Sequence, residues 1–307
     1  MPEELAARAA ELGYEALALT DHDGVYGSLE FAHAAKAFGV RPITGAEVTL
    51  ADRSHVTLLV ETAQGYANLC RLLTAAHART RDGTELASPA LDAALLAELN
   101  EGIVCLSGCA RHGLAVRNPN GAAALARAFG PERFFVELQR PYERGDEYRN
   151  AALRDLAKTL GVRTVATGDP HAHHPRRTAL QDVLVAIRNR TSLDGCEPER
   201  RGNRESVLGA PSDVAERFPL DRDAVERAGE LAARLEFDLT EDLGYRYPDF
   251  SETGEPAIHQ LARVCDRAFE ERYGNTNGLK RRARRRLDDE LKLIGELGLA
   301  GFFLLHW

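Results

Sequence analysis

Two hydrophobic periods alternate along the first 170 residues of the chain. Short apolar runs rich in β-branched residues separate longer segments with helical periodicity. The strands predicted from this pattern are Glu15–Thr20, Arg41–Ala46, His55–Glu61, Gly102–Ser107, Arg133–Leu138 and Arg163–Thr167. The helices predicted between them are 3–12, Leu29–Phe38, Tyr66–Ala78, Ala122–Ala128 and Glu147–Leu160. Strands that alternate with helices predict a parallel β/α architecture, either a barrel or an open sheet.

The strand signal fades after about residue 175, where helical periodicity takes over. The helices predicted there are Ala179–Arg190, Pro211–Phe218, Arg222–Leu235, Ile258–Tyr273 and Leu279–Leu297. Glycines and prolines gather in Leu243–Pro256, between the third and fourth of these helices, and are typical of a linker or long turn. We therefore expect a β/α domain over 1–240, a linker over 241–256 and a separate helical segment over 257–307. The apolar end Gly301–Trp307 is one that an independent domain seldom exposes, so we expect a truncated chain.

Composition narrows the class of protein. Of the 307 residues, 44% are hydrophobic and 28% are charged, which is typical of a globular protein. The N-terminus lacks the basic start and apolar stretch of a signal peptide, and no apolar run approaches the ~20 residues of a membrane span, so we expect a cytoplasmic protein. Five cysteines without a Cys-x-x-Cys pair favour reduced thiols over a disulfide framework.

Charge is unevenly distributed along the chain. The net charge of −8 argues against coating of nucleic acid by the whole surface. The run Lys280–Arg286 nevertheless carries six cations in seven positions. This run either contacts phosphate groups, such as those of DNA, or is the solvated face of a helix, and the sequence leaves both interpretations open.

Metal-binding side chains follow the predicted strands. Parallel strands of a β/α fold end at a common rim, and imidazoles and carboxylates at such a rim hold divalent metals that activate water. This donor set accepts Zn²⁺, Mn²⁺ or Fe²⁺ without choosing among them. Two candidates keep an alternative interpretation, His55 as an edge residue of its strand and Cys109 as a buried thiol. The candidate metal ligands are Asp21, His22, Glu47, His55, Cys109, Asp169 and His171.

The segments that carry these residues resemble a known family. Leu19–His22, Pro42–Glu47, Leu106–Cys109 and Ala166–His171 are similar to motifs of the PHP (polymerase and histidinol phosphatase) domain, in the order found at the N-terminus of bacterial DNA polymerase III alpha subunits. Thr178–Leu184 and Asp242–Pro248 are most similar to the error-prone, damage-tolerant branch. The resemblance implies a distorted seven-stranded β/α barrel whose rim holds up to three metal ions.

Within that family the matching ligand positions are His22, Glu47, His55, Cys109, Asp169 and His171, with Asp21 adjacent. The family's first strand carries His-x-His, and this chain starts after it. The resemblance therefore implies a PHP-type distorted (β/α)7 barrel that lacks its first strand and has an incomplete metal centre. A helical segment then leads into the polymerase region.

Three functions are compatible with this resemblance. The first is the PHP-domain portion of an error-prone DNA-directed DNA polymerase, a nucleotidyltransferase of DNA repair and translesion synthesis. Its Mg²⁺-binding polymerase carboxylates would lie beyond Trp307, so this portion alone would not polymerise DNA. Its partners would be DNA, through the full-length polymerase, and other polymerase or repair subunits, with no membrane. The second is a metal-dependent phosphoesterase of the histidinol-phosphatase type. The third is a catalytically silent module that supports the polymerase or docks partners.

Overall fold

The computed structural model describes residues 1–80, 87–200, 202–243, 254–274 and 279–306. These form two compact units, Met1–Leu243 and Gly244–Trp307. Most of the expected linker, residues 244–253, lies outside the described residues.

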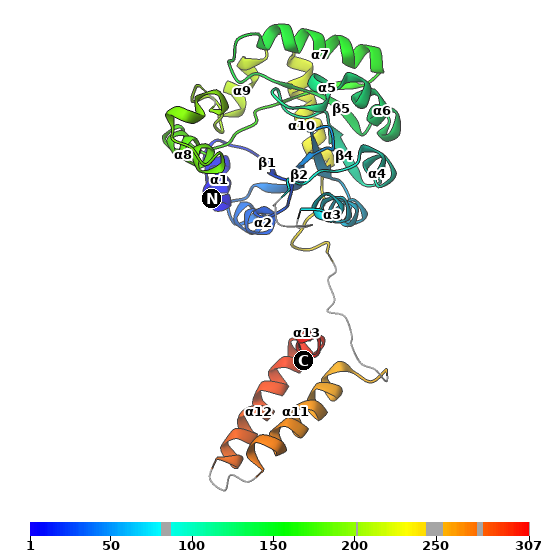
Figure 1. Ribbon diagram of the computed structural model, residues 1–307, viewed down its shortest axis with the longest axis vertical. Coiled ribbons are helices and arrows are strands. Elements are labelled where there is room, and N and C mark those ends of the chain that lie inside the picture. The colour runs from blue at the N-terminus through cyan, green and yellow to red at the C-terminus, as the bar shows by residue number, and fades with distance from the viewer. Residues whose placement is uncertain (81–86, 201, 244–253, 275–278, 307) are drawn as a thin grey trace. The chain divides into compact units, whose positions relative to one another are not determined.

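The first unit is built on a curled six-stranded sheet with the strands in chain order (Figure 1). Its strands are β1 (Ala16–His22), β2 (Arg41–Thr49), β3 (His55–Val60), β4 (Ile103–Leu106), β5 (Phe134–Gln139) and β6 (Arg163–Thr167). Neighbouring strands run parallel except β3, which is antiparallel to both β2 and β4. The expectation of an all-parallel sheet is wrong at β3, because the five residues 50–54 that join it to β2 are too few for a parallel crossover.

The sheet forms a half-barrel, in agreement with the expected distorted β/α barrel. β1 and β6 each pair with one neighbour in the sheet, so the barrel is not closed between them. Helices surround the sheet in Figure 1, and α10 packs against β6 and β1. The helices and 3-10 turns of this unit are α1 (Pro2–Glu11), α2 (Ser28–Ala37), α3 (Ala63–His77), α4 (Ala93–Glu98), α5 (Leu114–Arg117), α6 (Pro119–Phe129), α7 (Asp146–Leu160), η1 (Pro175–Arg177), α8 (Thr178–Arg188), η2 (Asp194–Glu199), α9 (Pro211–Arg217) and α10 (Arg222–Arg234).

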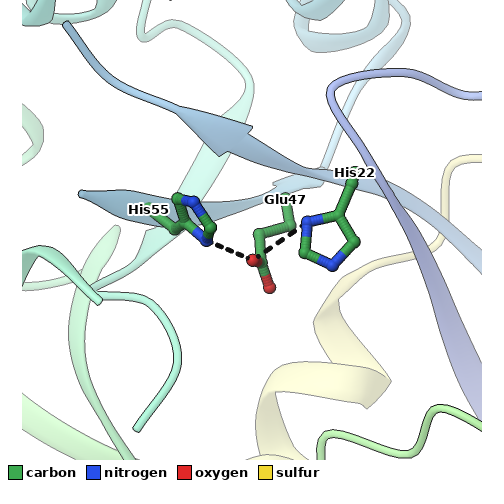
Figure 2. A group of neighbouring side chains, drawn as sticks. All are labelled: His22, Glu47 and His55. Atoms are coloured by element: carbon green, nitrogen blue, oxygen red, sulfur yellow. Dashed lines mark hydrogen bonds and ion pairs between the residues drawn. The ribbon is translucent and has the colours of Figure 1, made fainter. Parts of the chain in front are cut away.

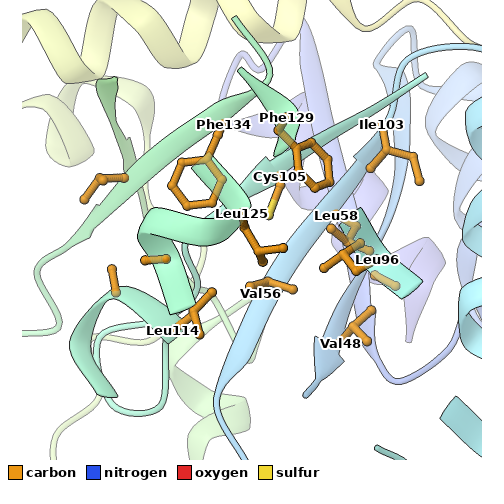
Figure 3. Packing of buried hydrophobic residues seen from close by; sticks show 14 of the residues in the cluster. Val48, Val56, Leu58, Leu96, Ile103, Cys105, Leu114, Leu125, Phe129 and Phe134 are labelled. Carbon is orange, nitrogen blue, oxygen red and sulfur yellow. The ribbon is translucent and has the colours of Figure 1, made fainter. Parts of the chain in front are cut away.

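Alternation of side chains along each strand divides the core into an outer and an inner layer. The outer layer includes Leu58, Cys105 and Phe134, which pack with helix residues such as Leu125 and Phe129 (Figure 3). The inner layer is smaller. Its strand residues are Ile43, Leu59, Val104, Leu106, Phe135 and Val165, and they pack against Leu231 and Leu235 of the α10 segment.

The second unit is a helical hairpin followed by a short helix. It consists of α11 (Ala257–Tyr273), α12 (Lys280–Glu296) and α13 (Ala300–His306), and α11 packs against both of the others. Leu261, Ala300 and Leu304 are buried at its centre. In the described part of the chain, no helix combines the length and the apolar character that crossing a membrane requires.

Candidate metal centre

Two imidazoles face one carboxylate at the rim of the half-barrel. His22 is the last residue of β1 and is the register partner of Glu47 on β2, while His55 begins β3. Figure 2 shows both imidazoles pointing toward the Glu47 carboxylate. His55 Nδ1 lies 2.7 Å and His22 Nδ1 lies 3.2 Å from Glu47 Oε1. All three side chains are on the inner face of the sheet, because each lies four residues from a residue that packs in the inner layer. These inner-layer residues are Ala18 on β1, Ile43 on β2 and Leu59 on β3.

The donor set of this group fits a divalent metal. One ligand atom from each of His22, Glu47 and His55 lies within 4.8 Å of the others. Glu47 is buried, whereas the His22 side chain is 51% exposed, so solvent and solutes reach the group from one side. Two imidazoles and one carboxylate are a donor set of catalytic zinc sites, which keep a further position for water or substrate.

Asp169 and His171 lie beside this group. The His171 Nε2 atom is 3.3 Å from Asp169 Oδ1, and the centroid of its ring is 6.3 Å from that of His22. The His171 backbone amide donates to the Ser206 carbonyl, which fixes the segment after β6. Asp169 has a φ of +45°, a left-handed conformation that is uncommon for a residue with a side chain. The structure thus brings this pair near the three-residue group without including it.

Asp21 and Cys109 have other surroundings. Asp21 continues the alternation of Leu17 and Leu19, which face the outer side of β1, so its side chain points away from His22. Its Oδ2 atom accepts a hydrogen bond from the Gly27 amide at 2.7 Å.

Cys109 is buried, and this burial, with the nearby Glu47 carboxylate, raises the pKa of its thiol to about 12. A thiol binds metal as the thiolate, so metal binding here would have to displace a proton. The structure therefore places Asp21 and Cys109 outside the group, and ligand roles for Asp21, Cys109, Asp169 and His171 stay predictions.

A cavity of about 620 Å³, which Glu47 and Asp169 help to line, extends into the half-barrel between β1 and β6. Its inner wall is apolar and includes Leu231 and Leu235 of the α10 segment. At the rim end the lining contains three carboxylates, those of Glu47, Glu137 and Asp169. The candidate centre thus opens onto an apolar cavity that is acidic at one end.

Glu137 was not among the residues predicted for the site. It is 4% exposed and accepts hydrogen bonds from Thr167 Oγ1 and, at 2.8 Å, from Gln139 Nε2. Burial raises its pKa to about 7; the two hydrogen bonds oppose the shift, and the Asp169 and Glu47 carboxylates add to it. The signal in the sequence is a Glu and a Gln two positions apart in an otherwise apolar strand, Phe134–Gln139, which places both on the inner face.

His112 is the second residue that the sequence interpretation missed. The centroid of its ring lies 5.5 Å from that of His55, and its backbone amide lies 3.4 Å from Cys109 Sγ. Burial lowers its pKa, which favours the neutral imidazole that can bind metal. His112 lies in an irregular segment between β4 and α5, so hydrophobic periodicity could not have identified it.

The raised pKa of Glu137 predicts a specific pH dependence of stability. Because the native state retains a proton that the unfolded state loses, the native state is relatively stabilised at low pH, and this contribution is lost as pH rises through about 7. The glutamine side chain of the variant Glu137→Gln does not titrate and keeps the shape of the neutral acid. We therefore expect the stability of Glu137→Gln, relative to the original chain, to improve by about 3 kcal/mol between about pH 4.5 and about pH 8.

Urea denaturation in metal-free buffer at several pH values measures this difference. The exposed Glu98 provides the control, because Glu98→Gln should keep a constant difference over the same range. A pH-independent difference for Glu137→Gln would show that Glu137 ionises normally in the folded chain.

Comparisons with known proteins agree with the sequence motifs. Residues 1–141 match the family model described as the PHP domain. The chain is 35% identical to an error-prone DNA polymerase of Symbiobacterium thermophilum over 99% of its length, and 32% identical to one of Pseudomonas paraeruginosa over 98%. These matches confirm the resemblance to the PHP domain of error-prone polymerases. The chain spans about 30% of the length of the first relative and 28% of the second.

Among solved structures, the chain is similar to an amidohydrolase from Chromobacterium violaceum. The TM-score is 0.37 with 17% identity, and the match covers 54% of this chain and 80% of that chain. This likeness is too low to assign a fold or a function.

Proposed function

We propose that this chain is the PHP-domain portion of an error-prone DNA-directed DNA polymerase. The observation that carries the proposal is the 35% identity to a polymerase of that name along 99% of the chain. The whole protein would transfer nucleotides onto DNA in the cytoplasm during repair and translesion synthesis. Residues 1–240 would form the PHP metal-binding domain, and residues 257–307 would begin the polymerase region, whose Mg²⁺ site would lie elsewhere in the protein. DNA and other polymerase or repair subunits would be its partners.

We propose further that His22, Glu47 and His55 hold a divalent ion, namely Zn²⁺, Mn²⁺ or Fe²⁺. Such an ion would supply a polarised phosphoryl oxygen or a water of lowered pKa. Asp169, His171 and the buried Cys109 are the nearby residues that could extend the site to a second ion. The Glu137 carboxyl, with a pKa of about 7, can hold or release a proton at Oε1 or Oε2 near neutral pH.

Exchange of the matched segment tests the polymerase proposal. A chimera would carry residues 1–307 in place of the matched part of the Symbiobacterium polymerase, and primer extension would be measured on a primed template. We expect extension within about tenfold of the unmodified relative, because the inserted segment would supply the same structural contacts. The relative with this segment deleted is the control and should lose activity. A folded chimera that extends no primer would contradict the proposal.

Phosphoester hydrolysis is a second candidate function of the same site. The observation that favours it is the group of metal-binding donors, one of which, Glu47, lines the same cavity as Glu137 and Asp169. Release of phosphate from a phosphomonoester by the manganese-loaded chain, lost in Asp169→Asn, would support hydrolysis. If chelation lowers thermal stability while the loaded chain releases no phosphate, the site serves structure alone.

A further inference from the structure

The basic run at the start of α12 divides into two sets of side chains. Three of its cations form ion pairs within the second unit: Lys280 with Glu270, Arg284 with Asp266 and Asp288, and Arg286 with Glu290. The other three, Arg281, Arg282 and Arg285, are exposed. Within the described part of the chain, the ion pairs of the basic run are those of Lys280, Arg284 and Arg286, and none involves these three arginines.

Arg281, Arg282 and Arg285 share one face of the helix. At about 100° per residue, positions 281, 285 and 282 fall within an arc of about 100°. Together they span about one turn, or about 6 Å along the axis, which is a compact cluster of three guanidinium groups. We refer to Arg281, Arg282 and Arg285 as the arginine face.

The arginine face does not serve the stability of α12. Cations at the N-terminal end of a helix are unfavourable because the helix dipole is positive there, and like charges four residues apart repel. The first turn of α12 contains no acidic residue. A segment selected only for helix stability would place Asp or Glu at positions 281 and 282 of the first turn, so the arginines there point to a ligand that is itself negative.

We propose that the arginine face binds the phosphate backbone of nucleic acid, independently of base sequence. Guanidinium groups bind phosphate through two parallel hydrogen bonds, and exposed amides of a helix N-terminus favour the same charge. No aromatic residue lies in the run Lys280–Arg286, so contact with phosphate is favoured over base stacking. The choice of DNA among nucleic acids rests on the proposed function.

An anionic membrane is the competing partner, and α12 fits it less well. A helix that lies on a membrane needs a free apolar face opposite its cations. Leu291 and Ile294 of α12 instead pack against the buried cluster formed with α11 and α13. Leu293 is the one exposed large apolar side chain of α12, and a single leucine is not a continuous apolar face. The arginines therefore present positive charge without an apolar face of α12 wide enough for insertion.

The dependence of DNA binding on salt tests this inference. The full chain would be titrated onto fluorescent DNA from about 50 to about 200 mM NaCl, and the slope of log K against log salt would be measured. Arg281→Gln/Arg282→Gln/Arg285→Gln should reduce the slope by about 2 on single-stranded DNA and by about 3 on duplex. Replacement of the same three residues by Lys keeps the charges and should restore most of the slope.

Arg71, Arg188 and Arg222 provide the matched control, since all three are exposed and lie on other helices. Their replacement by Gln changes the net charge equally and should leave the slope unchanged. The arginine-face variant removes like charges from a helix end, so its thermal stability should not fall, which separates lost binding from unfolding.

Two results would overturn the inference. One is an unchanged slope in the arginine-face variant. The other is that vesicles of anionic lipid bind through these arginines while DNA does not. Either result could occur while the chimeric polymerase still extends primers, so failure of this inference and failure of the proposed function are distinguishable.

Discussion

Glu47→Gln is expected to lower the affinity of the chain for Mn²⁺ or Zn²⁺ by at least about 100-fold. The Glu47 carboxylate is the anionic donor of the three-residue group, and its Oε1 atom lies within 3.2 Å of a nitrogen of each imidazole. Gln has the same shape, but its neutral amide is a much weaker ligand for a divalent ion. Isothermal titration of the metal-free chain with each metal measures the change.

The exposed Glu98 at the end of α4 again provides a matched control, because Glu98→Gln removes one negative charge that is not part of the three-residue group and should leave the affinity unchanged. The metal-free Glu47→Gln chain should unfold at a temperature close to that of the original metal-free chain, which would show that the fold is intact. Native metal affinity in Glu47→Gln would contradict a ligand role for Glu47.

Phe134→Ala is expected to reduce the free energy of unfolding by about 3 to 5 kcal/mol. Phe134 on β5 is fully buried in the outer layer, where Figure 3 shows it near Leu125 and Cys105. Removal of its ring loses buried apolar area and leaves a cavity that the sheet and α6 cannot fill without moving. Chemical denaturation of both chains measures the effect.

Tyr148→Ala removes an aromatic ring of similar size from the surface. Tyr148 is 84% exposed on α7, so its replacement should change the free energy of unfolding by less than about 0.5 kcal/mol. If Phe134→Ala costs no more than Tyr148→Ala, the outer layer is not the packed core of this unit.

Hydrophobic periodicity predicted all six strands of the sheet, because each is a short apolar run bounded by polar or turn residues. β3 (His55–Val60) is one residue shorter than the predicted strand His55–Glu61. β1 ends two residues beyond the predicted strand Glu15–Thr20. That extension matters, because it puts His22 inside the strand and gives it a fixed face. The direction of β3 was predicted wrongly, since it follows from the length of a connection rather than from any periodicity. The short helices α4 and α5 were also missed, as six and four residues are too few for a periodic signal.

The residues of the candidate site were also predictable in part, because the predicted strands place their ends at one rim. Strand ends that share a rim brought His22, Glu47 and His55 together, as the positions of their motifs suggested. Asp21 was expected beside His22, but adjacent strand residues face opposite sides of a sheet, and it lies on the outer side. Glu137 gave little sign of its role, because a raised pKa results from burial and from carboxylates contributed by distant segments. Such effects depend on the three-dimensional neighbourhood and not on local sequence.

Anomalous diffraction from crystals of the chain grown with Mn²⁺ or Zn²⁺ would show whether the three-residue group is the metal centre. We predict a metal peak bonded to His22, Glu47 and His55, at about 2.0 to 2.2 Å for Zn²⁺, and the peak should be absent from crystals of Glu47→Gln. A metal bound at full occupancy elsewhere, with these three side chains free of it, would contradict the assignment of this group as the metal centre.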